Sequence, residues 1–249
     1  MKHSENFKRF VWESILKKRD FALRLPNDTS QSLESSKLYP IFSDYPIKWM
    51  VDIGANDGHH LSNSNLFIKN GWSALLVEPV PSSLRKAIKW HASNPQVKFE
   101  MLAISNHIGE QKIFLDKSGD NHYFATLETE PSLLRDAYVG MESITVKTSK
   151  LDVVLMQHEI PHNFAILSLD VEGHEVKVLE NLGSFRPACI LVERNLSQMK
   201  QAMKKQKILT DLNYIYGARI GCNEVYIDST SKYIQDRIQH FQALSSIGI

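Results

Sequence analysis

The feature that most constrains the fold is a short apolar run that ends in a glycine turn, within residues 49–58. Residues 49–53, Trp-Met-Val-Asp-Ile, have the length and β-branched content of a buried strand, and Gly54 follows directly. Glycine permits the tight turn that leads from a strand into a helix, and it lets a ligand approach the backbone closely. We therefore predict a strand–turn–helix unit at this point.

The alternation of strand and helix continues along the chain. Further apolar strands are predicted at residues 74–77, 97–104, 164–169 and 188–192. Helices are predicted between them at residues 61–70, 81–91, 175–182 and 197–212, and near the end at 231–244. Residues 214–219 and 224–228 are typical of an antiparallel pair. Because strand–helix–strand crossovers are right-handed and yield parallel neighbours, the pattern predicts an α/β, Rossmann-like fold. Its sheet has about seven strands, is mostly parallel with an antiparallel last pair, and carries helices on both faces.

The N-terminal segment and the middle of the chain depart from this alternation. Residues 6–25 have apolar side chains at helical spacing, and the polar stretch that follows contains two prolines. We therefore interpret residues 1–47 as an N-terminal helix and a connecting segment, and residues 48–249 as the main domain. Residues 109–150 are less regular, with short strands at either end, and we interpret them as an insertion on the substrate side. Within them, aromatic residues of the stretch 120–140 are candidates for the acceptor pocket.

Charge and cysteine content exclude several classes of protein. The chain has 29 Lys and Arg against 28 Asp and Glu, whereas nucleic-acid and membrane-surface binding usually need a basic excess. Two cysteines, Cys189 and Cys222, are too few for a disulfide framework or a zinc site. The N-terminus lacks the apolar run of a signal peptide, and no stretch approaches about 18 apolar residues. We expect a cytoplasmic protein without a membrane span.

The glycine turn favours a cationic ligand over a phosphate. A dinucleotide loop would place three glycines against a pyrophosphate, but here only Gly54 and Gly58 are present. Asp57 lies between them and Asp52 precedes the turn, and two carboxylates repel phosphate. S-adenosylmethionine carries an amino group and a sulfonium and has no phosphate. The alternative is an ordinary Asp/Asn/Gly turn.

An acidic residue marks the end of the second predicted strand. Glu78 lies 20 residues after Gly58, in the sequence Leu-Leu-Val-Glu-Pro. A carboxylate at the tip of this strand can accept hydrogen bonds from both hydroxyls of a ribose. The alternative is a surface glutamate at a strand end.

A polar cluster follows the strand predicted at residues 164–169. The sequence from Asp170 to Glu175 is Asp-Val-Glu-Gly-His-Glu, and the next strand ends at Glu193. Carboxyl ends of parallel strands lie at the edge where open α/β sheets bind ligands, so these groups should face one crevice. They could act on an acceptor as a general base, a hydroxyl acceptor or a cation site. The alternative is helix capping by Asp170, with first-turn acids favoured by the helix dipole.

Taken together, these motifs resemble the FkbM family of S-adenosylmethionine-dependent methyltransferases. The family pattern of D-x-G-A-N-x-G, then E-P, then D-x-E-G-x-E, then a strand ending in Glu, is matched in order at residues 51–58, 77–79, 169–175 and 191–193. Residues 102–105 and 149–152 also resemble family segments. One departure is His59-His60 after the glycine turn, whose role stays open.

The resemblance implies a class I methyltransferase fold, S-adenosylmethionine as cofactor, and O-methylation of a hydroxyl on a sugar, glycan or polyketide-like metabolite. The residues that match the cofactor motifs are Asp52, Gly54, Asn56, Asp57, Gly58, Glu78 and Ala103. The catalytic candidates are Asp170, Glu172, His174 and Glu193. Methyl transfer is an in-line displacement, and a hydroxyl acceptor needs a base to take its proton.

The identity of the base is left open by the sequence. His174 titrates in the useful range, and Asp170 and Glu172 are the other candidates. In a less favoured alternative, Asp170 with Glu193 and Asn195 holds Mg²⁺, which lowers the pKa of a bound hydroxyl. We predict no resident metal.

Other functions fit the sequence less well. It contains no Asn/Asp-Pro-Pro-aromatic motif for a flipped adenine and no suitably placed Pro-Cys for cytosine, which argues against a nucleic-acid methyltransferase. A nicotinamide oxidoreductase would need the missing third glycine. A protein that binds S-adenosylmethionine without catalysis would keep the same motifs and stays an alternative. The expected partner is a small-molecule or glycan acceptor, and a homodimer is an open alternative to a monomer.

Overall fold

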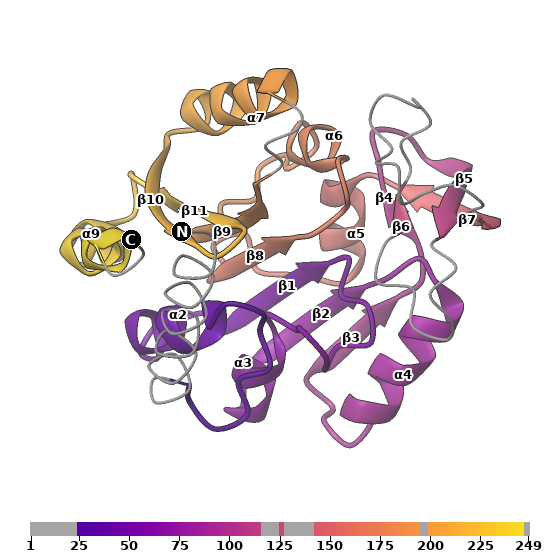
Figure 1. Ribbon diagram of the computed structural model, residues 1–249, viewed down its shortest axis with the longest axis horizontal. Helices are drawn as coiled ribbons and strands as arrows, with labels where there is room; N and C mark the ends of the chain where they lie inside the picture. Colours follow the sequence, from indigo (N-terminus) through magenta and orange to yellow (C-terminus); the bar gives the residue numbers. More distant parts are fainter. Residues whose placement is uncertain (1–23, 116–124, 127–141, 195–198, 247–249) are drawn as a thin grey trace, which may run out of the picture.

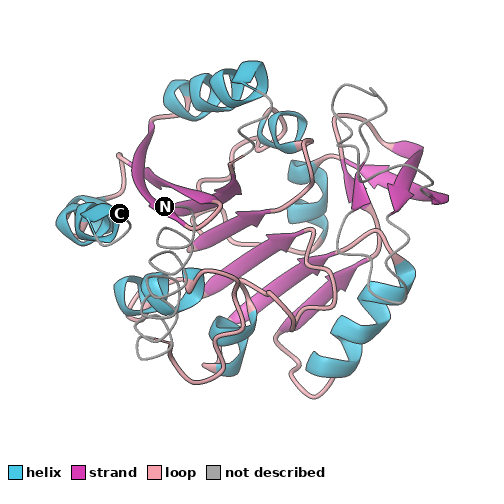
Figure 2. Ribbon diagram, in the orientation of Figure 1, coloured by secondary structure: helices cyan, strands magenta, loops and turns pink. Residues whose placement is uncertain are grey.

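The computed structural model describes residues 24–115, 125–126, 142–194 and 199–246, and its centre is a seven-stranded sheet (Figures 1 and 2). The strand order is β10-β11-β9-β8-β1-β2-β3. The strands are β1 (Trp49–Ile53), β2 (Ser73–Val77), β3 (Val97–Glu100), β8 (Ile166–Leu169), β9 (Cys189–Glu193), β10 (Tyr214–Ile220) and β11 (Asn223–Asp228). The first five strands are parallel to one another, whereas β11 pairs antiparallel with both β9 and β10. The predicted class I methyltransferase sheet is confirmed.

Helices cover both faces of the sheet because the side chains of its strands alternate between two buried layers. In β1, Val51 points into one hydrophobic cluster and Met50 into the other. The Val51 face is covered by α5 (Leu151–Gln157), α6 (Glu175–Leu179) and α7 (Met199–Asp211). The opposite face is covered by α2 (Glu34–Phe42), α3 (Asn65–Lys69), α4 (Pro81–His91), α8 (Lys232–Gln235) and α9 (Ile238–Ser246).

The order of the strands creates a switch point beside β1. The chain leaves β1 to form β2 and β3 on one side, and later returns to form β8 and β9 on the other. Open α/β sheets bind ligands in the crevice outside the carboxyl ends of their strands at such a point. Asp170 N–H also donates to the carbonyl of Ile53 at 3.0 Å, so β1 and β8 stay paired up to the crevice.

A second, four-stranded sheet lies beside the first (Figure 1). It contains β4 (Ala103–Ile104), β5 (Gly109–Leu115), β6 (Ala125–Thr126) and β7 (Glu142–Ser149), in the order β4-β7-β5-β6. The short strands expected at each end of the middle region are confirmed by β5 and β7. The single strand predicted at residues 97–104 is wrong: the chain leaves the main sheet after Glu100, exposes Met101, and pairs Ala103 with Thr148.

The segment interpreted as a connector contains a helix that packs into the main core. Leu38, Ile41 and Phe42 of α2 are buried with Tyr45 against the face that carries Met50. Their spacing is helical, but the serines and Pro40 within this segment are unfavourable in helices, so the sequence did not predict one. The helix expected within residues 6–25 lies almost wholly outside the described residues, as do Asn195 and most of the stretch 120–140.

Two further helices differ from their predicted bounds. The helix expected from residue 61 begins only at Asn65, because Leu61 has a left-handed backbone (φ +55°) that an α-helix cannot contain. The last helix is divided into α8 and α9. None of the described helices is long and apolar enough to span a membrane.

Candidate functional site

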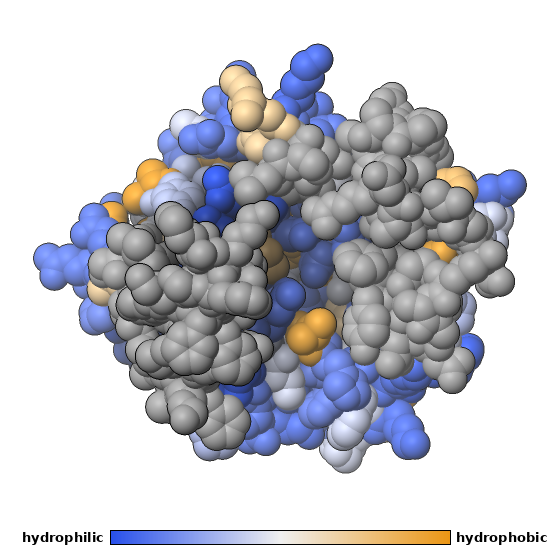
Figure 3. Space-filling view, in the orientation of Figure 1, coloured by the Kyte–Doolittle hydropathy of each residue, from blue (hydrophilic) through white to orange (hydrophobic). Residues whose placement is uncertain are grey.

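A cavity of about 580 Å³ opens at the carboxyl ends of β1, β2, β8 and β9. Ligand pockets in proteins usually have volumes of roughly 300–1,000 Å³. The face shown in Figure 3 is hollowed near its centre, where both hydrophilic and hydrophobic residues are visible. Of the predicted site residues, the cavity is lined by Asp52, Gly54, Asn56, Glu78, Ala103, Asp170, Glu172 and Glu193. The structure therefore brings together eight of the eleven residues singled out from the sequence.

The glycine turn after β1 fits against the chain's own backbone. Gly54 has φ +81°, and the N–H groups of Gly54 and Ala55 both donate to the carbonyl of Val77, at 2.9 and 3.1 Å. A Cβ on Gly54 would lie 1.8 Å from the carbonyl oxygen of Asp170. Within the chain, Gly54 therefore packs closely against the turn after β8, and it also lines the cavity, so an approach of a ligand to this turn stays a prediction.

Glu78 lies at the tip of β2 and is almost fully buried. Its Oε2 accepts a hydrogen bond from the N–H of Asn56 at 2.9 Å, and its Oε1 accepts one from Val80 at 2.8 Å. Burial raises the pKa of Glu78 to about 7, although these two hydrogen bonds favour the ionised form. Each oxygen keeps a second lone pair, so a carboxylate at the cavity wall can accept further hydrogen bonds from a ligand.

Asp52 lies deeper in the site, in β1. Its carboxylate accepts a hydrogen bond from the Ser64 hydroxyl at 2.7 Å. Burial raises the pKa of Asp52, and the hydrogen bond from Ser64 partly opposes that shift. This residue anchors the loop between β1 and α3 and forms part of the cavity wall.

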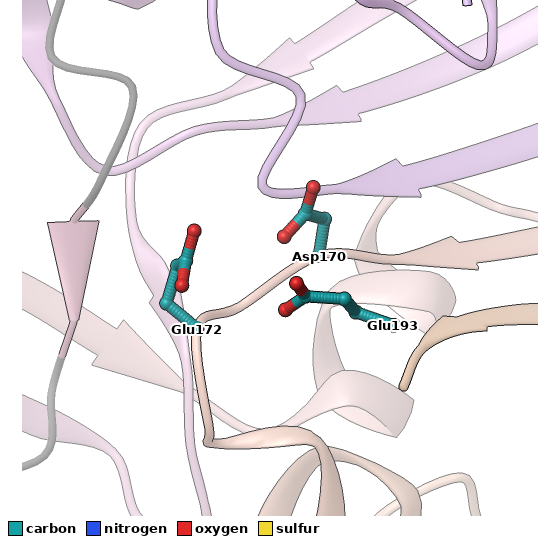
Figure 4. A group of neighbouring side chains, drawn as sticks. All are labelled: Asp170, Glu172 and Glu193. Carbon is teal, nitrogen blue, oxygen red and sulfur yellow. The ribbon is translucent and has the colours of Figure 1, made fainter. Parts of the chain in front are cut away.

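Three carboxylates converge at the other end of the cavity (Figure 4). Asp170 follows β8, Glu193 ends β9, and Glu172 lies on the loop between Asp170 and α6, with one oxygen of each within 4.8 Å of the others. Asp170 faces the open cavity, yet desolvation by the surrounding strand ends and repulsion from Glu193 raise its pKa well above its usual range. Glu172 has φ +50°, a backbone conformation rare outside glycine and common at functional sites.

Three of the predicted site residues are not among the described residues that line the cavity. Asp57 is buried and bonded within its own turn, and Gly58 packs against α4, where His91 donates to its carbonyl at 2.8 Å. His174 is also buried, with Nε2 3.1 Å from the hydroxyl of Ser105. A buried histidine beside a serine is poorly placed to reach an acceptor.

Several lining residues were not predicted from the sequence. They come from loops without periodicity and include Gln31, His60, Leu61, Asn63 and Cys222, whereas Arg194 was expected at this edge beside Glu193. Among these residues, the sequence singled out only His60, because His59-His60 departs from the family pattern after the glycine turn. The rest come from segments, such as that around Gln31, whose place beside the sheet depends on tertiary packing.

Comparison with known proteins identifies the family. The family model described as "Methyltransferase FkbM domain" matches residues 52–227, which covers the glycine turn, Glu78 and all three clustered carboxylates. No curated protein sequence matches the chain significantly.

Solved structures of methyltransferases are similar at low sequence identity. A methyltransferase FkbM from Methylobacillus flagellatus KT is 12% identical with a TM-score of 0.48, over 84% of this chain and 50% of that one. A TehB-like S-adenosylmethionine-dependent methyltransferase from Corynebacterium glutamicum ATCC 13032 Kitasato is 10% identical with a TM-score of 0.41, over 92% and 99%. Aeropyrum pernix fibrillarin, solved with natively bound S-adenosyl-L-methionine, is 8% identical with a TM-score of 0.42, over 73% and 66%. The chain thus spans about half the length of the first of these proteins.

Proposed function

The chain belongs to the FkbM family of S-adenosylmethionine-dependent methyltransferases, and from this premise we propose that it methylates a hydroxyl oxygen of a polyhydroxylated acceptor, such as a sugar, a glycan or a polyketide-like metabolite. One observation carries the proposal: a single cavity has Glu78 at one end and the Asp170–Glu172–Glu193 cluster at the other. One end suits the cofactor and the other suits hydroxyl groups.

The chemistry of the residues at the Glu78 end fits S-adenosylmethionine. Glu78 can accept hydrogen bonds from the two ribose hydroxyls while the N–H groups of Asn56 and Val80 hold it in place. Ala103 and Ile104 give this end an apolar wall for a flat base. When bound, the cofactor supplies a methyl group on a positively charged sulfur, which the negative charge of the cavity favours.

The carboxylates at the other end suit an acceptor with several hydroxyls. Ionised carboxylates accept hydrogen bonds only, and those with ionised groups are roughly twice as strong as neutral ones. Glu172 and Glu193 can therefore orient hydroxyl groups, with Asn63 and Arg194 nearby in the cavity wall. Holding the reacting oxygen in line with the methyl group is the main contribution that such an enzyme makes.

The test is methyl transfer from radiolabelled S-adenosylmethionine to a panel of sugars, glycans and polyketide-like alcohols. We expect a labelled methyl ether, identified by mass spectrometry and by the NMR shift of an O-methyl group. Methylation of nitrogen or carbon in place of oxygen would overturn the proposed acceptor class. Thermal shift with S-adenosylmethionine, S-adenosylhomocysteine and NAD is the accompanying binding assay, because only a true ligand stabilises the fold.

A further inference from the structure

A histidine–aspartate pair, His60 and Asp57, lies in the turn around Gly58, and His60 lines the cavity. Nδ1 of His60 and Oδ2 of Asp57 are 2.6 Å apart. The other oxygen of Asp57 accepts hydrogen bonds from the backbone N–H groups of His59 and His60, at 2.9 and 2.8 Å. The side chain of His60 is 58% exposed and lines the cavity, whereas that of Asp57 is only 7% exposed. A buried carboxylate thus holds an accessible imidazole ring.

The pairing determines which ring nitrogen of His60 can take a proton. Burial would raise the pKa of Asp57, but the hydrogen bonds from His60 and from the two backbone amides outweigh it and lower that pKa. Asp57 is therefore ionised and accepts the Nδ1–H of His60. In the neutral ring the lone pair then lies on Nε2, the tautomer that a histidine base requires.

The backbone around this pair is held in an uncommon conformation. Leu61 has φ +55°, the residue is 54% exposed, and it too lines the cavity. On one side Leu61 forms a β-bridge with Ser30, and on the other the ring of His59 stacks on Trp90 at 3.8 Å. Left-handed non-glycine residues persist only where the surrounding structure holds them, and they cluster at functional sites.

We propose that His60 is the general base of the methyl transfer and that Asp57 is its positioning residue; the inference rests on the proposed function. The acceptor oxygen forms a bond to the methyl carbon while the bond from that carbon to sulfur breaks, and its electron pair stays on sulfur. The hydroxyl proton moves to Nε2 of His60, and Asp57 stabilises the imidazolium that results. His174 is too deeply buried for this role, and the carboxylates of Asp170 and its neighbours orient the acceptor.

The first experiment needs no acceptor and no turnover. In ¹⁵N-histidine-labelled protein at neutral pH, with signals assigned by comparison with His60→Gln, we expect neutral His60 to carry its proton on Nδ1. Asp57→Asn keeps a side-chain oxygen for the two backbone N–H groups but loses the ionised partner, so it should shift the proton toward Nε2. A predominance of the Nε2–H tautomer in the wild type, or an Asp57→Asn spectrum without change, would overturn the positioning role of Asp57.

The second experiment is kinetic and uses the acceptor found with the wild-type chain. His60→Gln should lose about 100-fold or more in rate, the usual scale for a general base, with S-adenosylmethionine affinity within about 3-fold. His240→Gln is the control, since it removes an exposed imidazole on α9 that does not line the cavity and should stay within a few-fold of the wild type. Added imidazole should partly restore His60→Ala. Full activity of His60→Gln on an O-methylated product overturns this inference alone, whereas an N-methylated product from the wild type overturns the proposed function.

Discussion

The carboxylate of Glu78 accepts a hydrogen bond from the backbone N–H of Asn56 at 2.9 Å, and so ties the end of β2 to the glycine turn after β1. The same carboxylate faces the cavity. One side chain therefore bonds to the glycine turn and also presents hydrogen-bond acceptors to the cavity. Substitution of Glu78 should therefore weaken ligand binding by more than the loss of a single contact with the ligand would.

Glu78→Ala should weaken S-adenosylmethionine binding by at least about 1.5 kcal/mol, as expected for the loss of charge-assisted hydrogen bonds. Isothermal titration calorimetry on folded protein measures the change. Glu78→Gln should fall between wild type and alanine, because its single carbonyl oxygen can hold only one of the two backbone N–H groups. Unchanged affinity in the alanine variant would remove Glu78 from the cofactor site.

Glu78 should also make stability depend on pH. In the unfolded chain Glu78 has its ordinary pKa of 4.5, whereas burial raises its pKa in the folded protein to about 7. Between these values the folded state binds more protons, so its stability falls as pH rises, by about 3 kcal/mol in all from this group. Denaturant unfolding at pH 5 and pH 8 measures the free energy of unfolding, which should decrease less between these pH values for Glu78→Gln than for the wild type. Equal falls would show that Glu78 titrates normally.

Two glycines with the same backbone angle offer a matched pair of substitutions. Gly54 and Gly71 have φ +81° and +80°, but a Cβ on Gly71 meets nothing within 4 Å whereas one on Gly54 would collide with the Asp170 carbonyl. Gly71→Ala should cost only the strain of the left-handed conformation, about 1–2 kcal/mol. Gly54→Ala should cost more than about 3 kcal/mol, because backbone must move. Chemical denaturation measures the loss of unfolding free energy in each variant, and similar losses in the two would contradict the close contact between Gly54 and Asp170.

The sheet could be predicted from the sequence because most of its strands are apolar enough to be recognised alone, although the third strand ends at Glu100 and not at residue 104. The run from Trp49 to Ile53 is buried on both faces, as its β-branched content suggests, and the following glycine fixes the turn. The place of Glu78 at the tip of the second strand followed from its position directly after an apolar run, 20 residues beyond Gly58. Likewise, Asp170 and Glu193 follow adjacent parallel strands, so their meeting at one edge could be inferred before the structure.

The parts that could not be predicted depend on long-range contacts. Helix α2 joins the core through Phe42, although its segment is polar on average. His60 reaches the cavity only because Asp57 bonds its ring and Leu61 takes a left-handed conformation, which delays α3 to Asn65. No local sequence pattern predicts such a turn, and the spacing of apolar residues from residue 61 predicted a helix there instead.

The carboxylate cluster leads to a prediction about a divalent cation. Asp170, Glu172 and Glu193 each offer an oxygen within 4.8 Å of the others, a spacing that would also suit a metal ion. If they bind the acceptor directly, EDTA should leave wild-type turnover unchanged within about 2-fold. Loss of activity with EDTA and recovery with Mg²⁺ would instead place a cation between these carboxylates and the acceptor.

Substitution of the cluster should affect turnover more than cofactor affinity. Glu78, Asn56 and the glycine turn lie on the β1–β2 side of the switch point, whereas Asp170 and Glu172 follow β8 on the other side. Asp170→Asn and Glu172→Gln keep the size of each side chain and remove its ability to ionise, so S-adenosylmethionine affinity should stay within a few-fold by calorimetry. Because oriented acceptor contacts strengthen in the transition state, at least one variant should lose about 100-fold in kcat/KM. Full turnover of both variants on a confirmed acceptor would reduce the cluster to a structural feature of the β8–α6 loop.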